Sequence, residues 1–260
     1  VFILSEQEAS RLRLEKTLLV KMVKGLQVQR YALLDKGFVM VNTSEKTDIE
    51  EYPRIKAHLS RFRQQLEARH KYKTGVCPWY GIGLRQNEEI LSQRRKILVP
   101  KYATGNKFAY DNGIGFYCTS DVYAIAPRAA CPIDLRYVLG ILNSRLMEFY
   151  HTRVTKLKRD GYYEYFAEQL RRLPIKRVDL RKTDEKATHD NLVHLVGKLV
   201  DAKNRVLLIE KSFAEQISLH PSEERLSRLR TYFEYDEIRP NVLGGFNREK
   251  GTVCNFDLSR

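Results

Sequence analysis

Residues 155–165 read TKLKRDGYYEY, in which a cluster of cations directly precedes a cluster of aromatic rings. Ammonium and guanidinium groups neutralise phosphates, and aromatic rings stack on bases, so this combination is typical of nucleic-acid binding. Asp160-Gly161 is a turn-forming dipeptide, which predicts that the stretch is a loop. We expect Tyr165 to anchor this loop in the core, with Tyr162 or Tyr163 meeting the nucleic acid. The predicted contacts are Lys156, Lys158, Arg159, Tyr162 and Tyr163.

Two further stretches combine cations, aromatic rings and amides, namely CPWYGIGLRQN at 77–87 and KYATGNK at 101–107. Both are predicted loops, where binding residues are most often found. The alternative for the aromatic residues is that they fill the core and hydrogen-bond at its edge. Together with an intervening pair of arginines, the predicted contacts are Trp79, Tyr80, Arg85, Gln86, Arg94, Arg95, Lys101, Tyr102, Asn106 and Lys107.

No residue pattern predicts catalysis by this chain. A glycine-rich cofactor loop following a strand and a tetrapeptide of the Asn-Pro-Pro-Tyr type, which would indicate a methyltransferase, are both absent from the sequence. The nearest approach to a Mg²⁺-dependent nuclease is Asp184-Glu185-Lys186 with Asp160 or Asp179, in a polar stretch typical of a helix cap. The histidines include no pair four residues apart and the cysteines no Cys-x-x-Cys pair, so we expect neither a metal site nor a disulfide framework.

The excess of positive charge is concentrated in two blocks of the chain. The 260 residues include 46 Lys and Arg against 32 Asp and Glu, a formal net charge of +14. Residues 54–107 hold 13 cationic and 3 acidic side chains, and residues 151–182 hold 10 and 4. Solvated helix faces would also be charged, but two such blocks favour a phosphate-binding surface. A polyanionic partner is expected, with nucleic acid ahead of an anionic membrane.

The elements before residue 95 are predicted to be two helices separated by two short strands. Ser5 begins a capping box, and the apolar spacing predicts a helix from there toward Gly25. ALLD at 32–35 and GFVMVN at 37–42 are predicted strands. Pro53 begins a predicted amphipathic helix with a basic outer face. Its apolar stripe is Ile55, Leu59, Phe62 and Leu66.

The second half of the chain is predicted to contain a small sheet and then mainly helices. Short β-rich runs from residue 96 to 126 predict an antiparallel or mixed sheet, and helical periodicity returns over 134–154. A long helix over 190–217 repeats apolar residues in steps of three and four, which predicts a coiled-coil or helix-pair seam. The alternative is a core helix of a single globular domain. The seam residues are Leu192, Leu195, Leu199, Ala202, Val206, Ile209 and Phe213, and the apolar face is widened by Val193, Val196, Val200 and Leu207.

The order of motifs along residues 15–177 resembles that of a known family. It runs from LLVKMVKGLQVQRY through EEYPRIKAHLSRFRQQLEAR, WYGIGLRQ and KILVPKYATGNKFAYDNGIGFYCTSDVYAIAP to LGILNSRLMEFY, the basic-aromatic loop and LRRLPI. The family is the TaqI-like C-terminal specificity domain, the target-recognition part of adenine-specific DNA methyltransferases and type IIG restriction-modification enzymes. The helix after His189 is similar to the helical segment that follows this domain.

We therefore predict a mixed α+β chain built around a small β-sheet recognition domain with flanking helices. A DNA target-recognition domain over 1–180 would be followed by a helical spacer over 181–217 and by a short helix and tail over 218–260. The resemblance implies sequence-specific recognition of double-stranded DNA on behalf of methyltransferase and nuclease modules, in the same or a partner polypeptide. S-adenosylmethionine and Mg²⁺ are expected only in those modules, and no cofactor is expected in this chain.

An RNA-binding module is the alternative function, because tyrosines beside cations also stack on unpaired bases. A Mg²⁺-dependent nuclease is the less favoured alternative. The sequence contains no run of eighteen apolar residues, and its apolar start VFIL is too short for a signal peptide. We accordingly expect a cytoplasmic protein without a membrane partner, and the resemblance implies a role in bacterial defence.

Overall fold

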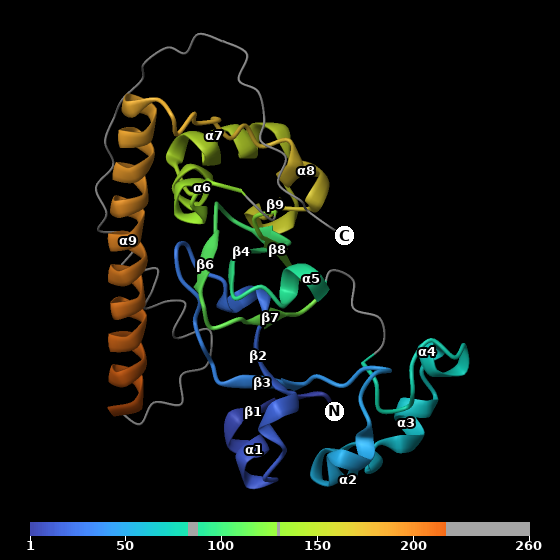
Figure 1. The fold of residues 1–260 in the computed structure, drawn as a ribbon. Helices are drawn as coiled ribbons and strands as arrows, with labels where there is room; N and C mark the ends of the chain where they lie inside the picture. The colour runs from blue at the N-terminus through green and yellow to red at the C-terminus, as the bar shows by residue number, and fades with distance from the viewer. Residues whose placement is uncertain (83–87, 129–130, 217–260) are drawn as a thin grey trace.

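The fold is built around small β-sheets (Figure 1). The computed structural model describes residues 1–82, 88–128 and 131–216. One sheet has the strand order β1-β3-β2-β7, a second has the order β6-β4-β8, and β5 pairs with β9 in a separate ribbon. The predicted mixed α+β fold is confirmed. The strands are β1 (Ile3–Ser5), β2 (Leu19–Val23), β3 (Phe38–Val41), β4 (Arg95–Pro100), β5 (Tyr102–Ala103), β6 (Ala109–Asn112), β7 (Tyr117–Cys118), β8 (Val122–Ile125) and β9 (Tyr163–Glu164).

The helices form separate groups around these sheets. Figure 1 shows α2 to α4 at one end of the molecule, α7 and α8 at the other, and α9 upright along one side. No helix in the described part of the chain is both long and apolar enough to span a bilayer. The helices are α1 (Glu6–Arg11), α2 (Pro53–Ser60), α3 (Arg63–Glu67), α4 (His70–Lys73), α5 (Glu88–Leu91), α6 (Leu135–Leu142), α7 (Arg145–Val154), α8 (Ala167–Arg171) and α9 (Thr183–Gln216).

The first helix begins as predicted and ends earlier than predicted. The Ser5 hydroxyl accepts a hydrogen bond from the Glu8 amide at 3.1 Å, so the predicted cap is confirmed. The helix stops at Arg11, and Arg13 has a φ of 52°, which no continuing right-handed helix contains. Residues Leu19–Val23 form β2 instead, antiparallel to β3 and parallel to β7. The prediction of a helix reaching Gly25 is therefore wrong, because pairing with two strands overrides the local helical spacing.

The two other N-terminal predictions differ from the structure in detail. GFVMVN contains β3 as predicted, whereas ALLD forms no strand, and Leu33 makes only an isolated bridge to Val28. The predicted helix after Pro53 is divided into α2 and α3 at Arg61 and Phe62. Its apolar stripe nevertheless faces inward as predicted. The buried members are Ile55, Leu59 and Leu66, and Phe62 packs against the same cluster.

The main core lies between the β6-β4-β8 sheet and the helices α6, α7 and α8. The antiparallel or mixed sheet predicted over 96–126 is confirmed for β4, β6 and β8, which pair antiparallel, while β5 pairs with β9 and β7 joins the N-terminal sheet. The continuous helical periodicity over 134–154 is divided into α6 and α7. Between them Asn143 exchanges hydrogen bonds with the backbone of Phe108, and Ser144 caps α7 by accepting from Met147 N. The break turns α7 away from the axis of α6.

The long helix α9 packs on α6 through residues that were expected to widen its apolar face. Val196, Val200 and Leu207 are buried, whereas Leu195, Leu199 and other residues of the predicted seam are exposed. Close packing is possible at Gly140, where an added Cβ would lie 2.7 Å from Val196 Cγ2. The predicted helix is thus confirmed, and the coiled-coil or helix-pair role of the seam residues stays a prediction.

Candidate nucleic-acid interface

The ribbon of β5 and β9 joins two of the three predicted contact stretches. Tyr102 pairs with Glu164 and Ala103 with Tyr163 in antiparallel register. The Tyr165 amide extends the pairing by donating to Lys101 O at 2.9 Å. The stretches 101–107 and 155–165, which are far apart in sequence, therefore form one continuous backbone unit.

The cationic residues lie in a tight turn at the end of this ribbon. Lys158 N donates to Tyr162 O at 2.7 Å, and Asp160 and Gly161 have φ values of 60° and 77°. These left-handed conformations are tolerated by aspartate and favoured by glycine, so the turn predicted from Asp-Gly is confirmed. The side chains from Lys156 to Tyr162 are exposed along the turn. The local fold thus presents its cations and Tyr162 to solvent.

The core anchors both halves of the ribbon through Tyr165. Its ring is fully buried, and its hydroxyl donates to Asn106 Oδ1 at 2.9 Å, so the predicted anchor is confirmed. Asn106 Nδ2 donates in turn to Leu142 O at 2.7 Å, and the side chain of Asn106 is only 3% exposed. The structure therefore places Asn106 behind the predicted surface, where its amide holds the 101–107 loop in place.

The cations of the ribbon have different electrostatic surroundings. Lys158 Nζ lies 2.8 Å from Glu164 Oε1, and this partner raises the pKa of Lys158, which stays protonated. Lys101 Nζ lies 5.1 Å from the centre of the Tyr123 ring, within cation–π range. Lys156 and Arg159 form no ion pair with any residue that the structure describes. These two side chains are the best placed to bind phosphate without losing an internal partner.

The tyrosines of the ribbon divide between surface and core. Tyr162 is 41% exposed and Tyr102 is 48% exposed, with Tyr102 packed edge-on against Phe166. Tyr163 is half-buried and packs against the main core. Lys107 is also half-buried. Of the two tyrosines predicted as alternatives for contact, Tyr162 has the freer ring.

The third predicted stretch lies elsewhere in the fold. Trp79 and Tyr80 pack against the N-terminal core cluster, and the Tyr80 hydroxyl donates to Thr47 O at 3.0 Å. Arg63 covers the Trp79 ring at 4.9 Å. These contacts match the alternative in which both rings fill the edge of the core. Arg85 and Gln86 lie outside the described residues.

Arg94 and Arg95 are also separated from the ribbon. Both are exposed at the start of β4, and Arg94 Nε donates to Gly113 O at 3.1 Å. Lys101 follows the other end of this six-residue strand, which places the two sites about 20 Å apart along it. The structure therefore gathers the predicted contacts of 101–107 and 155–165 and leaves the arginine pair apart.

Exposed apolar side chains on α7 adjoin the basic turn and were not predicted as contacts. Leu146, Phe149 and Val154 are each more than half exposed, as is Leu157 within the turn. In one continuous helix over 134–154, Leu146 and Phe149 would continue the apolar stripe of Leu139 and Leu142, both of which are buried. The break at Ser144 instead turns Met147 and His151 toward the core. The only sequence signal for this change was the Asn-Ser pair that separates the helices.

His151 supports β9 from the core side. Its Nε2 lies 3.0 Å from Glu164 O, its ring stacks on Tyr165 at 4.2 Å, and its Nδ1 has no hydrogen-bond partner among the described atoms. Burial lowers the pKa of His151 below 6.5. The ring is therefore neutral at pH 7, with Nε2 as the donor to the Glu164 carbonyl.

This histidine is expected to make folding sensitive to acid. The unfolded chain takes up a proton at His151 near pH 6.5, whereas the folded chain does so only at lower pH, so stability falls as the pH drops below about 6.5. The change His151→Gln keeps a donor for Glu164 O and removes this proton uptake. Denaturant unfolding between about pH 7.5 and 5 should show a smaller loss of stability in the variant. An equal loss in both proteins would contradict this role.

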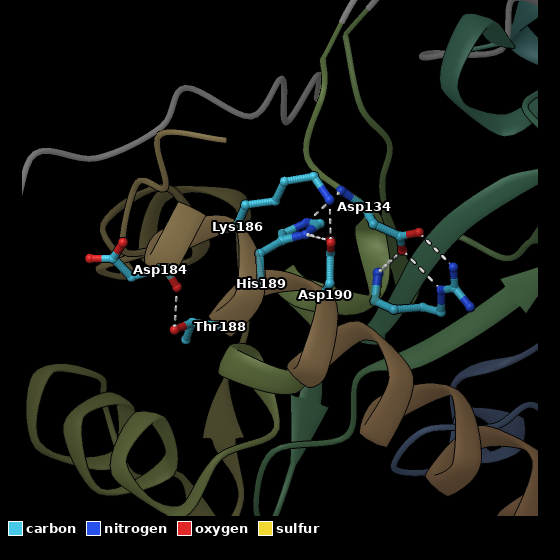
Figure 2. Close-up of polar contacts among 7 residues, drawn as sticks. Asp134, Asp184, Lys186, Thr188, His189 and Asp190 are labelled. Atoms are coloured by element: carbon cyan, nitrogen blue, oxygen red, sulfur yellow. Dashed lines mark hydrogen bonds and ion pairs between the residues drawn. The ribbon is translucent and has the colours of Figure 1, made fainter. Parts of the chain in front are cut away.

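The acidic residues considered for a nuclease begin helix α9 and are held in local contacts. Asp179 pairs with Arg181, Glu185 with Lys182, and Lys186 Nζ with Asp190 at 2.6 Å. Figure 2 shows the Asp184 carboxylate directed away from Lys186, His189 and Asp190. No group of three His, Cys, Asp or Glu suited to a metal ion occurs within residues 1–82, 88–128 and 131–216. Over these residues Cys77, Cys118 and Cys131 are free thiols.

His189 links the start of α9 to the start of α6 (Figure 2). Its Nε2 accepts from Asp134 N at 3.3 Å, which leaves the proton on Nδ1 to be donated to Asp190 Oδ1 at 2.9 Å. Asp134 also accepts from Arg136 and so caps α6. Burial raises the pKa of Asp134, but the hydrogen bonds from Arg136 outweigh it and hold that pKa below its usual value. This cluster is a structural joint between two helices.

Comparison with known protein families identifies the class of domain to which the chain belongs. Residues 20–175 match the TaqI-like C-terminal specificity domain, and the chain belongs to this family. The match includes the β5–β9 ribbon and the helices α6 and α7, which lie between its two strands in the chain.

The chain is also similar to particular methyltransferases. It is 23% identical over 177 residues to the Type II methyltransferase M.HindII of Haemophilus influenzae, a region that covers 66% of this chain and 34% of the relative. It is likewise 23% identical to the Type II methyltransferase M.HincII of Haemophilus influenzae, over a region that covers 66% of this chain and 35% of that relative. The Type II methyltransferase M.PaeR7I of Pseudomonas aeruginosa is 25% identical over 130 residues, or 50% of this chain and 22% of the relative. The matched region thus amounts to about a third or less of these relatives.

Proposed function

We propose that the chain recognises a short sequence in double-stranded DNA, as the specificity part of a type II restriction-modification methyltransferase. The observation that carries the proposal is the β5–β9 ribbon, which puts Lys156, Arg159 and Tyr162 on one exposed turn. The cations supply affinity for phosphates without regard to sequence, and the exposed rings of Tyr102 and Tyr162 are available for contact with bases. The family membership of the chain supports the same function.

Several finer features belong to the same proposal. Recognition would serve an adenine-specific methyltransferase of the type IIG class, in which the base to be methylated is flipped out of the duplex. S-adenosylmethionine, and Mg²⁺ where DNA is cut, would bind to catalytic modules in the same or a partner polypeptide. Residues 1–180 would contact DNA, and α9 would act as the spacer that follows. The protein would act in the cytoplasm.

The salt dependence of binding tests this function. We expect the protein, joined to its methyltransferase module where that is needed for affinity, to bind duplex DNA with log K falling against log salt at a slope of about −3 or steeper. That slope corresponds to at least three or four phosphate contacts, at about −0.9 each. Fluorescence anisotropy at several salt concentrations would measure it. Binding without this slope, or no binding with the module present, would refute the proposal.

A competition experiment separates DNA recognition from the RNA alternative. Duplex DNA should displace labelled duplex from the protein more effectively than single-stranded RNA of the same length. The stacking of unpaired bases on Tyr102 and Tyr162 would give the opposite order.

A further inference from the structure

Helix α9 carries an apolar stripe that no other part of the described chain covers. Leu195, Leu199 and Val206 are 48%, 46% and 44% exposed, and Ile209 and Phe213 are 67% and 55% exposed. With the exposed Ala202, these residues follow one another in alternating steps of four and three along the helix. We call this set the α9 seam: Leu195, Leu199, Ala202, Val206, Ile209 and Phe213. This repeat is typical of a helix that packs along its length against another helix.

The seam faces away from the part of α9 that holds the helix on the domain. At about 100° per residue, the seam lies roughly 120° around the helix from the buried Val196, Val200 and Leu207. Those buried residues already satisfy the contact with α6. A second helix can therefore pack on the seam without displacing α6. The seam is about 27 Å long. Because helices gain most of their stability from packing, a stable pair requires a partner helix with a matching apolar repeat.

The charges beside the seam indicate what kind of helix fits it. Lys198 and Arg205 are exposed along its outer edge, and the half-buried Lys203 lies on its inner edge. The half-buried Glu210 also lies on the inner edge, so the edges carry three cations and one acid. In a parallel, in-register pair of two copies of α9, Lys198 of one copy would face Lys203 of the other, which is repulsive, and only Arg205 would face an acid, Glu210. Acidic residues on the partner helix would instead meet these cations favourably.

We propose that the α9 seam binds an amphipathic helix of a partner protein, one that repeats apolar residues in steps of three and four and carries acidic residues beside them. The apolar repeat buries the seam, and the acidic flanks pair with Lys198, Lys203 and Arg205. This site is independent of the β5–β9 ribbon, so it can be tested without DNA.

A designed pair of peptides tests the proposal on the full chain. Both peptides are helices of about four heptads with leucine at the seam-facing positions, and they differ only in carrying glutamate or lysine at the flanking positions. Titration calorimetry should show the glutamate peptide binding at least roughly 10-fold more tightly than the lysine peptide. Raising the salt concentration should narrow this difference.

Variants of α9 locate the binding to the seam. Ile209→Glu places a charge in the seam and should weaken binding of the glutamate peptide by at least roughly 10-fold. Leu208→Glu is the matched control, because Leu208 is 64% exposed on the same helix but points about 140° away from the centre of the seam. It should leave binding unchanged. Circular dichroism confirms that both variants keep their helix content.

Three results would overturn the proposal. The first is equal binding of the two peptides, which would show that the flanking charges do not select the partner. The second is no measurable binding of the glutamate peptide by the full chain. The third is a homodimer in sedimentation that Ile209→Glu dissociates, which would assign the seam to a second copy of this chain.

Discussion

Replacing Lys156, Lys158 and Arg159 together by glutamine is expected to weaken binding to duplex DNA on the order of 100-fold at physiological salt. Each lost phosphate contact removes the release of about 0.9 counterion, and three such losses multiply. The slope of log K against log salt should become shallower by about 3. Anisotropy titrations at several salt concentrations measure both effects. The three side chains are exposed on a turn, but the change also removes the ion pair between Lys158 and the Glu164 side chain, which is only 9% exposed. Urea denaturation of the variant measures the accompanying loss of stability.

A variant with the same change in net charge controls for long-range attraction. Arg11, Lys16 and Lys46 are exposed in the N-terminal part of the chain, away from the β5–β9 ribbon. Their joint replacement by glutamine lowers the net charge equally and should reduce affinity only a few-fold. If both triple variants lost the same affinity and the same slope, the turn would have no special role, and binding would follow net charge alone.

Local signals in the sequence predicted the parts of the fold that local physics decides. The Ser5 cap, the helix start at Pro53 and the turn at Asp160-Gly161 each depend on a few neighbouring residues. Residues Leu19–Val23 were placed in a helix because their spacing fits either period, and only pairing with β3 and β7 makes them a strand. The sequence shows two apolar stripes on α9 but not which of them packs on the domain. That depends on the contact with α6, where Gly140 lies against Val196.

The sequence predicted which stretches could form the candidate interface, but only partly where their side chains lie in the fold. The stretches 101–107 and 155–165 were identified from their cations and rings, yet nothing in the sequence indicates that they pair as β5 and β9. The stretch that contains Trp79 and Tyr80 also combines cations, aromatic rings and amides, but these two rings pack at the edge of the core. Asn106 is likewise turned inward by Tyr165. Whether an aromatic or amide side chain faces solvent depends on contacts between distant segments, which composition does not reveal.

Asp111→Ala is expected to cost about 3 to 5 kcal/mol of folding stability, because it leaves a buried charge without its partner. Asp111 and Lys96 are fully buried, with Oδ2 and Nζ 3.2 Å apart between β6 and β4. Asp111 also accepts hydrogen bonds from the backbone amides of Ile114, Gly115 and Phe116. The substitution therefore removes an ion pair and leaves three backbone amides of the turn that leads to β7, of which that of Phe116 is buried, without their acceptor. Urea denaturation measures the loss.

Combining Lys96→Met with Asp111→Ala shows how much of the stability lost in Asp111→Ala is due to the buried ammonium group of Lys96. In Lys96→Met alone Asp111 keeps its three backbone donors, whereas in Asp111→Ala the remaining partner of Lys96 Nζ is Gln93 O at 2.6 Å. Lys96→Met should thus be the milder change, and adding it to Asp111→Ala should restore part of the stability. A double variant less stable than Asp111→Ala would contradict this account.

The pH dependence of Asp111→Ala gives an independent check on the same charge. Burial lowers the pKa of Lys96 from 10.5 in the native chain, and the attraction of Asp111 only partly offsets that effect. Without Asp111 the folded pKa of Lys96 falls further, while the unfolded value stays near 10.5. Between these values the unfolded state holds more protons, so stability rises with pH. Asp111→Ala should therefore recover part of its lost stability as the pH is raised from 7 toward about 9, and more steeply than the native chain, because a neutral Lys96 no longer needs its carboxylate.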